Sequence, residues 1–159
     1  MIILVMGVSG SGKTTVGEKL AESLGCEFRD ADDFHPQKNI EKMRNGIALN
    51  DADRLPWLQK MQDVIKQRLS ENTNIVITCS ALKESYRQML LINSESVKLV
   101  YLKGSFELIH KRLKERLNHF MSEKLLRSQF DILEEPSDAI TVEISEPLED
   151  IVQKIVEKL

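Results

Sequence analysis

The chain has 159 residues, a formal net charge of −3 and a pI near 5.7. This length gives room for one α/β domain with a substantial core but not for a second, separate domain, so we expect residues 1–159 to form a single unit. The acidic balance argues against a general nucleic-acid binder, because such a protein needs a clustered basic surface that releases counterions from phosphates.

The first predicted strand is the apolar run Ile2–Met6, and a glycine-rich turn follows it directly. A strand that leads through such a turn into a helix aims several backbone N–H groups and the positive end of the helix dipole at one polyphosphate. We therefore expect the chain to bind a nucleoside triphosphate at this P-loop. The turn fits the pattern GxxxxGK(S/T) and reads Gly7-Val8-Ser9-Gly10-Ser11-Gly12-Lys13-Thr14.

The residue types of the P-loop predict individual roles. Lys13 is expected to reach the β- and γ-phosphates and to take part in catalysis, and the Thr14 hydroxyl to help hold Mg²⁺. Val16, Leu20 and Leu24 recur along one face of the helix that follows. The predicted nucleotide-binding residues are those of the loop and the first helical turn: Gly7, Val8, Ser9, Gly10, Ser11, Gly12, Lys13, Thr14 and Thr15.

Two carboxylates, Asp30 and Asp32, stand at the end of the second predicted strand. If strand geometry persists, residues two apart project in the same general direction, here beside the P-loop. We expect Asp30 to orient the hydrated Mg²⁺ and Asp32 to accept the proton of an attacking hydroxyl. The alternative is that these acids cap a helix that begins near His35, and for Asp33 we favour that capping role.

The stretch from about residue 33 to residue 70 is the predicted acceptor-binding insertion, because it stands where a phosphate acceptor must face the γ-phosphate. Arg54 is expected to bind an anionic acceptor, since a guanidinium offers two parallel donors to a carboxylate. Its alternative role is a surface ion pair with Asp51 or Asp53. His35 is either a substrate contact or simply a residue at a helix start.

Strands and helices alternate along the chain, which predicts an α/β fold with a parallel sheet covered on both faces and ligands at the carboxyl ends of the strands. The third strand has no Asp or Glu at its tip, so the metal-binding acid common in ATPases is absent there. That absence favours a small-molecule kinase that uses the Asp30 region instead. The five predicted strands are Ile2–Met6, Cys26–Asp30, Ile75–Cys79, Val97–Leu102 and Ile140–Ile144.

Basic residues concentrate between Lys103 and Arg127, where seven basic side chains accompany three acidic ones. In an acidic chain that handles phosphates, such a segment is typical of a lid over anionic ligands, although a solvated helix face has the same composition. The predicted lid spans about residues 112–130.

The two cysteines, Cys26 and Cys79, lack the CxxC spacing of a zinc or redox site and indicate buried thiols of a reducing compartment. The apolar start is too short for a membrane span, and the P-loop follows at once where a signal peptide would show a cleavage site. We therefore expect a cytoplasmic enzyme with neither a membrane nor a nucleic-acid partner.

Several motifs, in order and at similar spacing, resemble those of the gluconokinases. The match covers most of the chain and is far more specific than the P-loop, which many families share. Besides the P-loop, the matching parts are the DxDxxHP-like run from Asp30, the segment from Lys42 to Leu58, the run Cys79–Lys83 with Tyr86-Arg87, and the segment from Arg116 to Gln129.

This resemblance implies a three-layer P-loop kinase fold with a five-stranded parallel sheet, like that of the shikimate and adenylate kinases. It implies transfer of the ATP γ-phosphate to the 6-hydroxyl of D-gluconate with Mg²⁺, in a cytoplasmic homodimer. Arg112 and Arg116 would belong to a lid that closes on the phosphates, and Arg116 would stabilise the charge of the transferring group. The residues implied near the sugar acid are Asp32, His35, Lys38 and Arg54.

Three other functions stay open at this stage. A shikimate kinase needs the same P-loop and strand-end acids, but that family has glycines after the third strand where this chain has Ser80-Ala81-Leu82. A kinase for nucleotides or cofactor precursors would need a second base pocket, and none is recognisable. A regulatory module that binds ATP without transferring phosphate does not require a base aimed at an acceptor.

Overall fold

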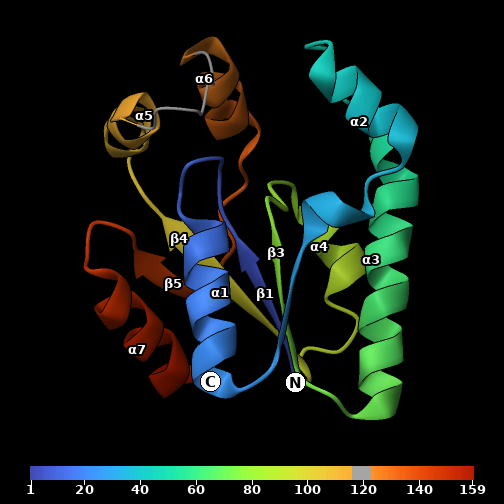
Figure 1. Ribbon diagram of the computed structural model, residues 1–159, viewed down its shortest axis with the longest axis vertical. Helices are drawn as coiled ribbons and strands as arrows, with labels where there is room; N and C mark the ends of the chain where they lie inside the picture. Colours follow the sequence, from blue (N-terminus) through green and yellow to red (C-terminus); the bar gives the residue numbers. More distant parts are fainter. Residues whose placement is uncertain (116–122) are drawn as a thin grey trace.

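The structure is a computed structural model that describes residues 1–115 and 123–159. Its strands and helices alternate along the chain (Figure 1). Among the helices of the described residues, none combines the length and the apolar composition needed to cross a membrane. In chain order the elements are β1 (Ile2–Met6), α1 (Lys13–Leu24), β2 (Glu27–Asp30), the 3₁₀ turn η1 (Ala31–Phe34), α2 (Gln37–Arg44), α3 (Asp51–Glu71), β3 (Ile75–Cys79), α4 (Glu84–Leu90), β4 (Val97–Lys103), α5 (Phe106–Glu115), α6 (Glu123–Ile132), β5 (Ile140–Glu143) and α7 (Leu148–Lys158).

The five strands form one parallel sheet in the order β2-β3-β1-β4-β5. β1 occupies the centre, with Ile2 opposite Ile75 of β3 on one side and opposite Val97 of β4 on the other. The expected five-stranded parallel sheet is confirmed, and three strand ends differ from the expected ones by a single residue. Since all strands are parallel, their carboxyl ends meet at one edge, where the P-loop also lies.

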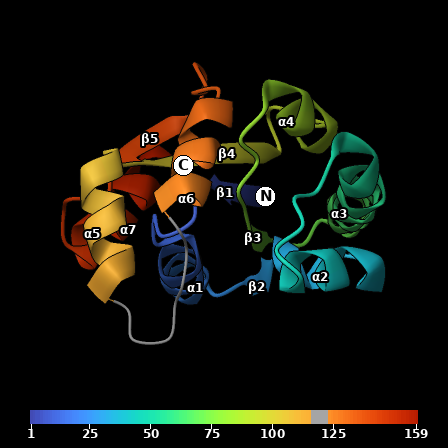
Figure 2. The same ribbon diagram turned by 90° about the horizontal axis from the view of Figure 1, so that it is seen from above.

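The sheet separates two hydrophobic cores. β1 is buried along its whole length, and its alternating side chains point to opposite faces. Ile3 and Val5 pack with α1, α5, α6 and α7, whereas Ile2, Leu4 and Met6 pack with α3 and α4. Figure 2 shows α1 and α7 on one side of the sheet and α3 on the other. The expected three-layer architecture is therefore confirmed.

The second core contains the tryptophan and one of the two cysteines that we expected to be buried. Trp57 lies in the second core with 5% of its surface exposed. Cys79 is buried in the same core, and this burial raises the pKa of its thiol to about 12. Cys26 is half-buried rather than fully buried, and both cysteines are free. The Cys79 thiol therefore stays protonated at neutral pH.

Helix α1 lies close to the sheet because one of its buried residues is a glycine. A Cβ added at Gly17 would stand 2.5 Å from Cγ2 of Thr78 in β3 and 2.8 Å from Cε2 of Phe28 in β2. Both distances are well below normal van der Waals contact. Gly17 therefore sets how closely α1, and with it the P-loop, approaches the neighbouring strands.

We expect Gly17→Ala to destabilise the protein, although alanine is normally favoured over glycine in a helix by about 1 kcal/mol. The added methyl group must push α1 away from Thr78 and Phe28, and such overpacking costs about 1–3 kcal/mol. Urea unfolding measures the difference. Glu18→Ala, at an exposed position of the same helix, is the control and should change the free energy of unfolding by less than about 0.5 kcal/mol. Equal stability of Gly17→Ala and the parent would show that α1 has room to shift.

Candidate active site

The P-loop connects the carboxyl end of β1 to the N-terminus of α1. Gly10 and Gly12 have φ angles of 82° and 91°, a left-handed conformation that glycine adopts without steric cost. The Ser11 N–H donates to the Val8 carbonyl at 3.1 Å and closes the turn. Because the first turn of α1 contains no acidic side chain, its N–H groups and the positive end of its dipole suit an anion.

Asp30 links the tip of β2 to the P-loop. Its Oδ2 accepts a hydrogen bond from Thr14 Oγ1 at 3.4 Å, and its Oδ1 accepts one from the Asp32 N–H at 2.9 Å. The strand ends at Asp30 and the 3₁₀ turn begins at Ala31, so the strand geometry that we expected to continue to Asp32 does not persist. The tight turn nevertheless keeps Asp32 within electrostatic reach of both Asp30 and Lys13.

The surroundings of Asp32 change the pKa of its carboxyl group. Reduced hydration raises its pKa, the negative charges of Asp30 and Asp33 add to the rise, and the positive charge of Lys13 opposes it. A raised pKa makes the ionised carboxylate a better proton acceptor. Lys13 is anchored nearby, because its Nζ donates to the Val8 carbonyl at 3.2 Å. Asp32 can therefore accept a proton, and Lys13 can balance negative charge that develops nearby.

The capping role that we favoured for Asp33 is wrong. Helix α2 begins only at Gln37, and its N-cap residue is Pro36, which offers no side-chain hydrogen bond. Asp33 lies inside the 3₁₀ turn, and Asp30 caps that turn by accepting the Asp32 N–H. The proline therefore separates the run of acids from the helix that they were expected to cap.

The contact between Thr14 and Asp30 gathers two oxygen donors next to the phosphate-binding turn. Mg²⁺ prefers oxygen ligands, keeps several waters, and is usually held by one or two protein oxygens together with substrate phosphates. A hydroxyl and a carboxylate in this position fit that chemistry.

His35, at the end of the 3₁₀ turn, and Trp57 of α3 form a stacked pair. Their ring centroids are 4.4 Å apart and their planes differ by 12°. Trp57 Nε1–H donates to the Ala31 carbonyl at 2.6 Å, which ties α3 to the 3₁₀ turn. Burial and the nearby charge of Arg54 lower the pKa of His35. The imidazole is therefore neutral at pH 7.

Arg54 has no ion pair with Asp51 or Asp53 within the described residues. Its guanidinium NH1 donates to the Tyr86 hydroxyl at 3.2 Å, and the group lies over the Tyr86 ring, 5.7 Å from its centroid. Asp51 instead accepts from Tyr86 at 2.5 Å and from Lys83 at 3.3 Å. The ion pair that we considered as an alternative role for Arg54 is thus not formed there.

Two side chains beside Arg54 have no role predicted from the sequence. Lys83 and Tyr86 both contact Asp51, and Tyr86 also accepts a hydrogen bond from Arg54. The only signal was their place in the segment that resembles the gluconokinases. Lys38 is exposed on α2 and makes no hydrogen bond or ion pair to the described residues. Arg116 lies outside the described residues.

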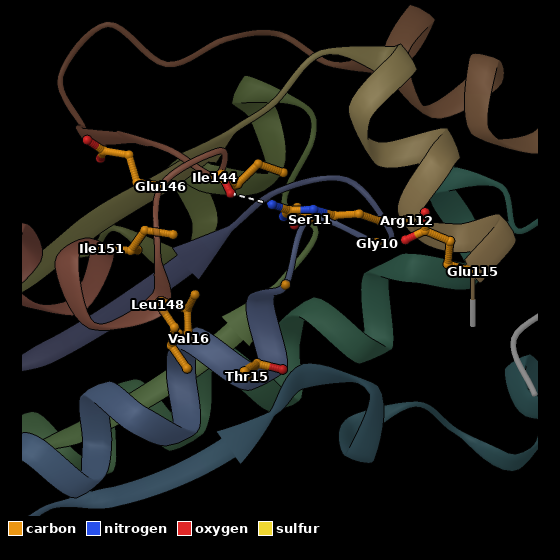
Figure 3. A pocket seen from close by; sticks show the side chains of 11 residues that line it. Gly10, Ser11, Thr15, Val16, Arg112, Glu115, Ile144, Glu146, Leu148 and Ile151 are labelled. Atoms are coloured by element: carbon orange, nitrogen blue, oxygen red, sulfur yellow. Dashed lines mark hydrogen bonds between the residues drawn. The ribbon is translucent and has the colours of Figure 1, made fainter. Parts of the chain in front are cut away.

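A cavity of about 400 Å³ lies beside the P-loop, between α5 and the turn that joins β5 to α7 (Figure 3). Arg112 of α5 borders it and donates from NH2 to the Ile144 carbonyl at 2.7 Å. The apolar side chains of Ile144, Leu148 and Ile151 form part of its wall. This apolar part of the wall, next to the phosphate-binding turn, suits a flat heterocyclic base.

Gln129 of α6 holds the P-loop from above through two hydrogen bonds. The Ser9 N–H donates to Gln129 Oε1 at 2.8 Å, and Gln129 Nε2 donates to Ser9 Oγ at 3.0 Å. The two residues are 120 positions apart, so no local pattern pointed to this contact. The amide thus fixes the corner of the loop that precedes Gly10.

Arg87 of α4 is a buried cation, with 1% of its surface exposed, to which we assigned no role beyond its place in the segment that resembles the gluconokinases. It donates to the carbonyls of Ala81 and Leu82 at 2.8 and 3.1 Å, and to the carbonyl of Glu134 at 2.7 Å. The φ of Ala81 is 42°, a left-handed conformation that is unusual for alanine. Arg87 therefore joins the turn after β3 to the segment that follows α6.

Comparison with known proteins gives consistent results. A family model described as shikimate kinase matches residues 9–159. The thermoresistant gluconokinase of Escherichia coli (strain K12) is 43% identical over 160 residues, which cover 98% of this chain and 91% of that protein. The relatives are thus similar along nearly their whole length.

Solved structures are similar to this chain as well. The crystal structure of a gluconokinase from Sinorhizobium meliloti 1021 has a TM-score of 0.87 at 41% identity, covering 98% of this chain and 89% of that one. Shikimate kinase from Aquifex aeolicus has a TM-score of 0.64 at 21% identity, covering 99% of this chain and 95% of that one. The second likeness concerns the fold alone, and it confirms the expected fold, which resembles that of shikimate kinases.

We expect Ser9 and Gln129 to act together in ATP binding. Gln129→Leu removes both hydrogen bonds, each worth about 0.5–1.5 kcal/mol, so ATP affinity should fall by roughly 5- to 100-fold because the loop is no longer held in its binding conformation. Ser9→Ala removes only the hydroxyl bond and should have a smaller effect. Isothermal titration calorimetry measures both.

The matched control for this pair is Gln153→Leu, which removes an exposed hydrogen bond between Gln153 and Glu157 on α7 and should leave ATP affinity unchanged. In the double variant with Ser9→Ala and Gln129→Leu, the loss should equal that of Gln129→Leu alone. Fully additive losses would show that the two side chains act independently.

Proposed function

This chain belongs to the gluconokinase family, within the broader shikimate kinase family, and we propose that it transfers the γ-phosphate of ATP to the 6-hydroxyl of D-gluconate, giving 6-phospho-D-gluconate and ADP. The observation that carries this proposal is the pair of acids, Asp30 and Asp32, beside the P-loop Lys13. A protein that only binds ATP has no need for a second carboxylate there, so the arrangement favours a phosphotransferase over a regulatory module.

The triphosphate lies along the P-loop, and the adenine occupies the cavity beside α5. Lys13 turns from the Val8 carbonyl toward the β- and γ-phosphates. The apolar wall that includes Ile144 and Leu148 packs against the base, and Arg112 borders the same cavity. This pose brings the γ-phosphate toward the acids at the end of β2.

The acceptor lies on the other side of the γ-phosphate, near Asp32, His35 and Arg54. The Arg54 guanidinium binds the carboxylate of gluconate, because a planar fork of donors matches two carboxylate oxygens. The Tyr86 hydroxyl accepts from Arg54 and keeps its plane in place. Lys38, exposed on α2, is a further contact of the sugar acid in this proposal.

The chemical step is an in-line transfer between two oxygens. Asp32 accepts the proton of the 6-hydroxyl while this oxygen bonds to the γ-phosphorus, and the bond to the oxygen between the β- and γ-phosphorus breaks, so that the electron pair leaves with ADP. Lys13 balances the charge on the phosphoryl oxygens, and Arg116 has the same role in the proposal. Thr14 and Asp30 would hold Mg²⁺, which would supply further positive charge to neutralise the β- and γ-phosphates.

Three parts of the proposal rest on the resemblance to gluconokinases rather than on contacts. The segment of about residues 112–130 is a lid whose closure excludes water, since water competes for the γ-phosphate. The enzyme is a homodimer. It works in the cytoplasm, where a reducing environment suits the two free cysteines.

ADP release with Mg-ATP and a series of acceptors tests the function. We expect strong release with D-gluconate and background release with shikimate, with a close epimer of gluconate and without acceptor, because Arg54 and the acids recognise one arrangement of carboxylate and hydroxyls. ³¹P and ¹³C NMR of the product locates the new phosphate on oxygen 6. Strong release with shikimate alone would make the chain a shikimate kinase, and release without any acceptor would point to an ATPase.

Asp32→Asn is expected to keep ATP binding and to lower kcat by at least about 100-fold, since a carboxamide cannot accept the proton. Glu18→Ala, on the exposed part of α1, is the control with unchanged kcat. The base must be ionised and its pKa is raised, so kcat of the parent should fall as the pH drops through a value above the ordinary aspartate pKa. Near-normal turnover of Asp32→Asn would remove Asp32 as the base.

A further inference from the structure

The imidazole of His35 has a second partner besides the ring of Trp57. The side-chain nitrogen Nδ2 of Asn39 lies 3.2 Å from His35 Nδ1, and the same Nδ2 donates to the main-chain carbonyl of Asp53 at 2.8 Å. Asn39 is fully buried, and His35 has 9% of its surface exposed. These groups form a small buried polar network on the acceptor side.

The network permits one placement of the hydrogens. The Asp53 carbonyl oxygen can only accept, so the Asn39 atom that faces it must be the amide nitrogen. The second hydrogen of that amide then points at His35 Nδ1, which must accept and carries no proton. The reversed amide would set two acceptor oxygens against each other. A neutral imidazole has one proton, so in His35 it sits on Nε2.

The remaining atom of the Asn39 side chain supports this assignment. Its oxygen, Oδ1, is fully buried and has no hydrogen-bond partner among the residues that the structure describes. An unpaired buried acceptor destabilises a fold, and an apolar side chain would avoid that cost. The amide is therefore present for its two donors, one of which serves His35.

We propose that Asn39 is a positioning residue that holds His35 as the neutral tautomer protonated on Nε2, so that His35 offers a hydrogen-bond donor to the acceptor substrate. Nε2 makes no hydrogen bond to the described residues and is not one of their fully buried unpaired atoms, so it faces solvent. The stack on Trp57 fixes the plane of the ring. The role as a donor to substrate rests on the proposed function, because hydroxyl and carboxylate oxygens of a sugar acid accept.

This tautomer separates the roles of two neighbouring residues. The only unprotonated ring nitrogen of His35 is Nδ1, which faces the buried Asn39 amide rather than solvent. His35 therefore cannot take the proton of the attacking hydroxyl while the network is intact. Asp32 remains the base, and His35 orients the acceptor.

The charged groups around His35 favour the neutral form. Arg54 of α3 acts on it through its positive charge and, together with burial, lowers the pKa of His35. The Asp53 carboxylate, which would favour an imidazolium, is occupied by Lys42, whose Nζ lies 2.9 Å from both of its oxygens. Asp32 contacts His35 through the main chain: its carbonyl accepts a hydrogen bond from the main-chain N–H of His35 at 3.3 Å.

NMR of the ¹⁵N-labelled protein without ligands reads the tautomer directly. Long-range ¹H–¹⁵N spectra at pH 7 distinguish a protonated from an unprotonated ring nitrogen, and His35→Asn identifies the His35 signals by their loss. We expect a proton on Nε2 and none on Nδ1, and on acidification we expect protonation only below the ordinary histidine pKa of about 6.5. A proton on Nδ1, or an imidazolium at pH 7, would overturn the proposal.

Two variants at position 39 test the cause. Asn39→Asp replaces the donor by an acceptor of the same shape, so His35 should gain a proton on Nδ1 and its pKa should rise. Asn39→Leu removes both donors and should give a mixture of tautomers. Asn45→Asp, at an exposed position at the end of α2, adds the same charge and should change neither property. An Nδ1 that stays unprotonated in both position-39 variants would show that Asn39 does not control His35.

Steady-state kinetics connect the tautomer to the substrate. In Asn39→Asp, at a pH above the raised pKa of His35, KM for gluconate should rise roughly tenfold while KM for ATP changes little, because the neutral Nδ1–H tautomer leaves Nε2 without a proton to donate to the sugar acid. A normal KM for gluconate in a variant with a changed tautomer would overturn the role toward substrate. If the parent shows the Nε2–H tautomer but does not phosphorylate gluconate, the proposed function fails and the assignment of the tautomer stands.

Discussion

The central position of β1 in a parallel sheet determines where every part of the proposed chemistry lies. β1 pairs with β3 on one side and β4 on the other, so the loop that leaves its carboxyl end projects from the middle of the sheet. β2 ends at the same edge, two strands away, and this brings Asp30 to the Thr14 hydroxyl. The phosphate-binding turn and the strand-end acids thus meet because the strands run in one direction, and α1 must pack closely at Gly17 for the contact to form.

Features encoded by neighbouring residues could be predicted from the sequence. The strands and the P-loop follow from apolar runs and glycine spacing, and the structure confirms them. The capping role of Asp33 was wrong because Pro36 starts α2 later and a 3₁₀ turn takes up the acids. The catalytic role of Asp32 and the substrate contact of Lys38 stay predictions.

Features that depend on the choice between several partners could not be predicted. Asp53 was a plausible partner for Arg54, but the capping box with Asn50 and the ion pair with Lys42 already occupy its carboxylate. Asp51 is likewise engaged by Tyr86 across 35 residues. Gln129 and Ser9 are 120 positions apart and meet only in the folded structure. In each case the local sequence offers several equivalent acceptors, and tertiary packing selects one.

Because Trp57 stacks on His35, its fluorescence is sensitive to changes at the imidazole ring. Trp57 is the single tryptophan of the chain, so the indole emission of the whole protein arises from one ring, 4.4 Å from the imidazole. A protonated imidazole is an efficient quencher of indole fluorescence, whereas a neutral one is a weak quencher. The emission intensity therefore reports the charge of His35 without any label, and a sugar acid bound at His35, as proposed above, would change the surroundings of the same ring.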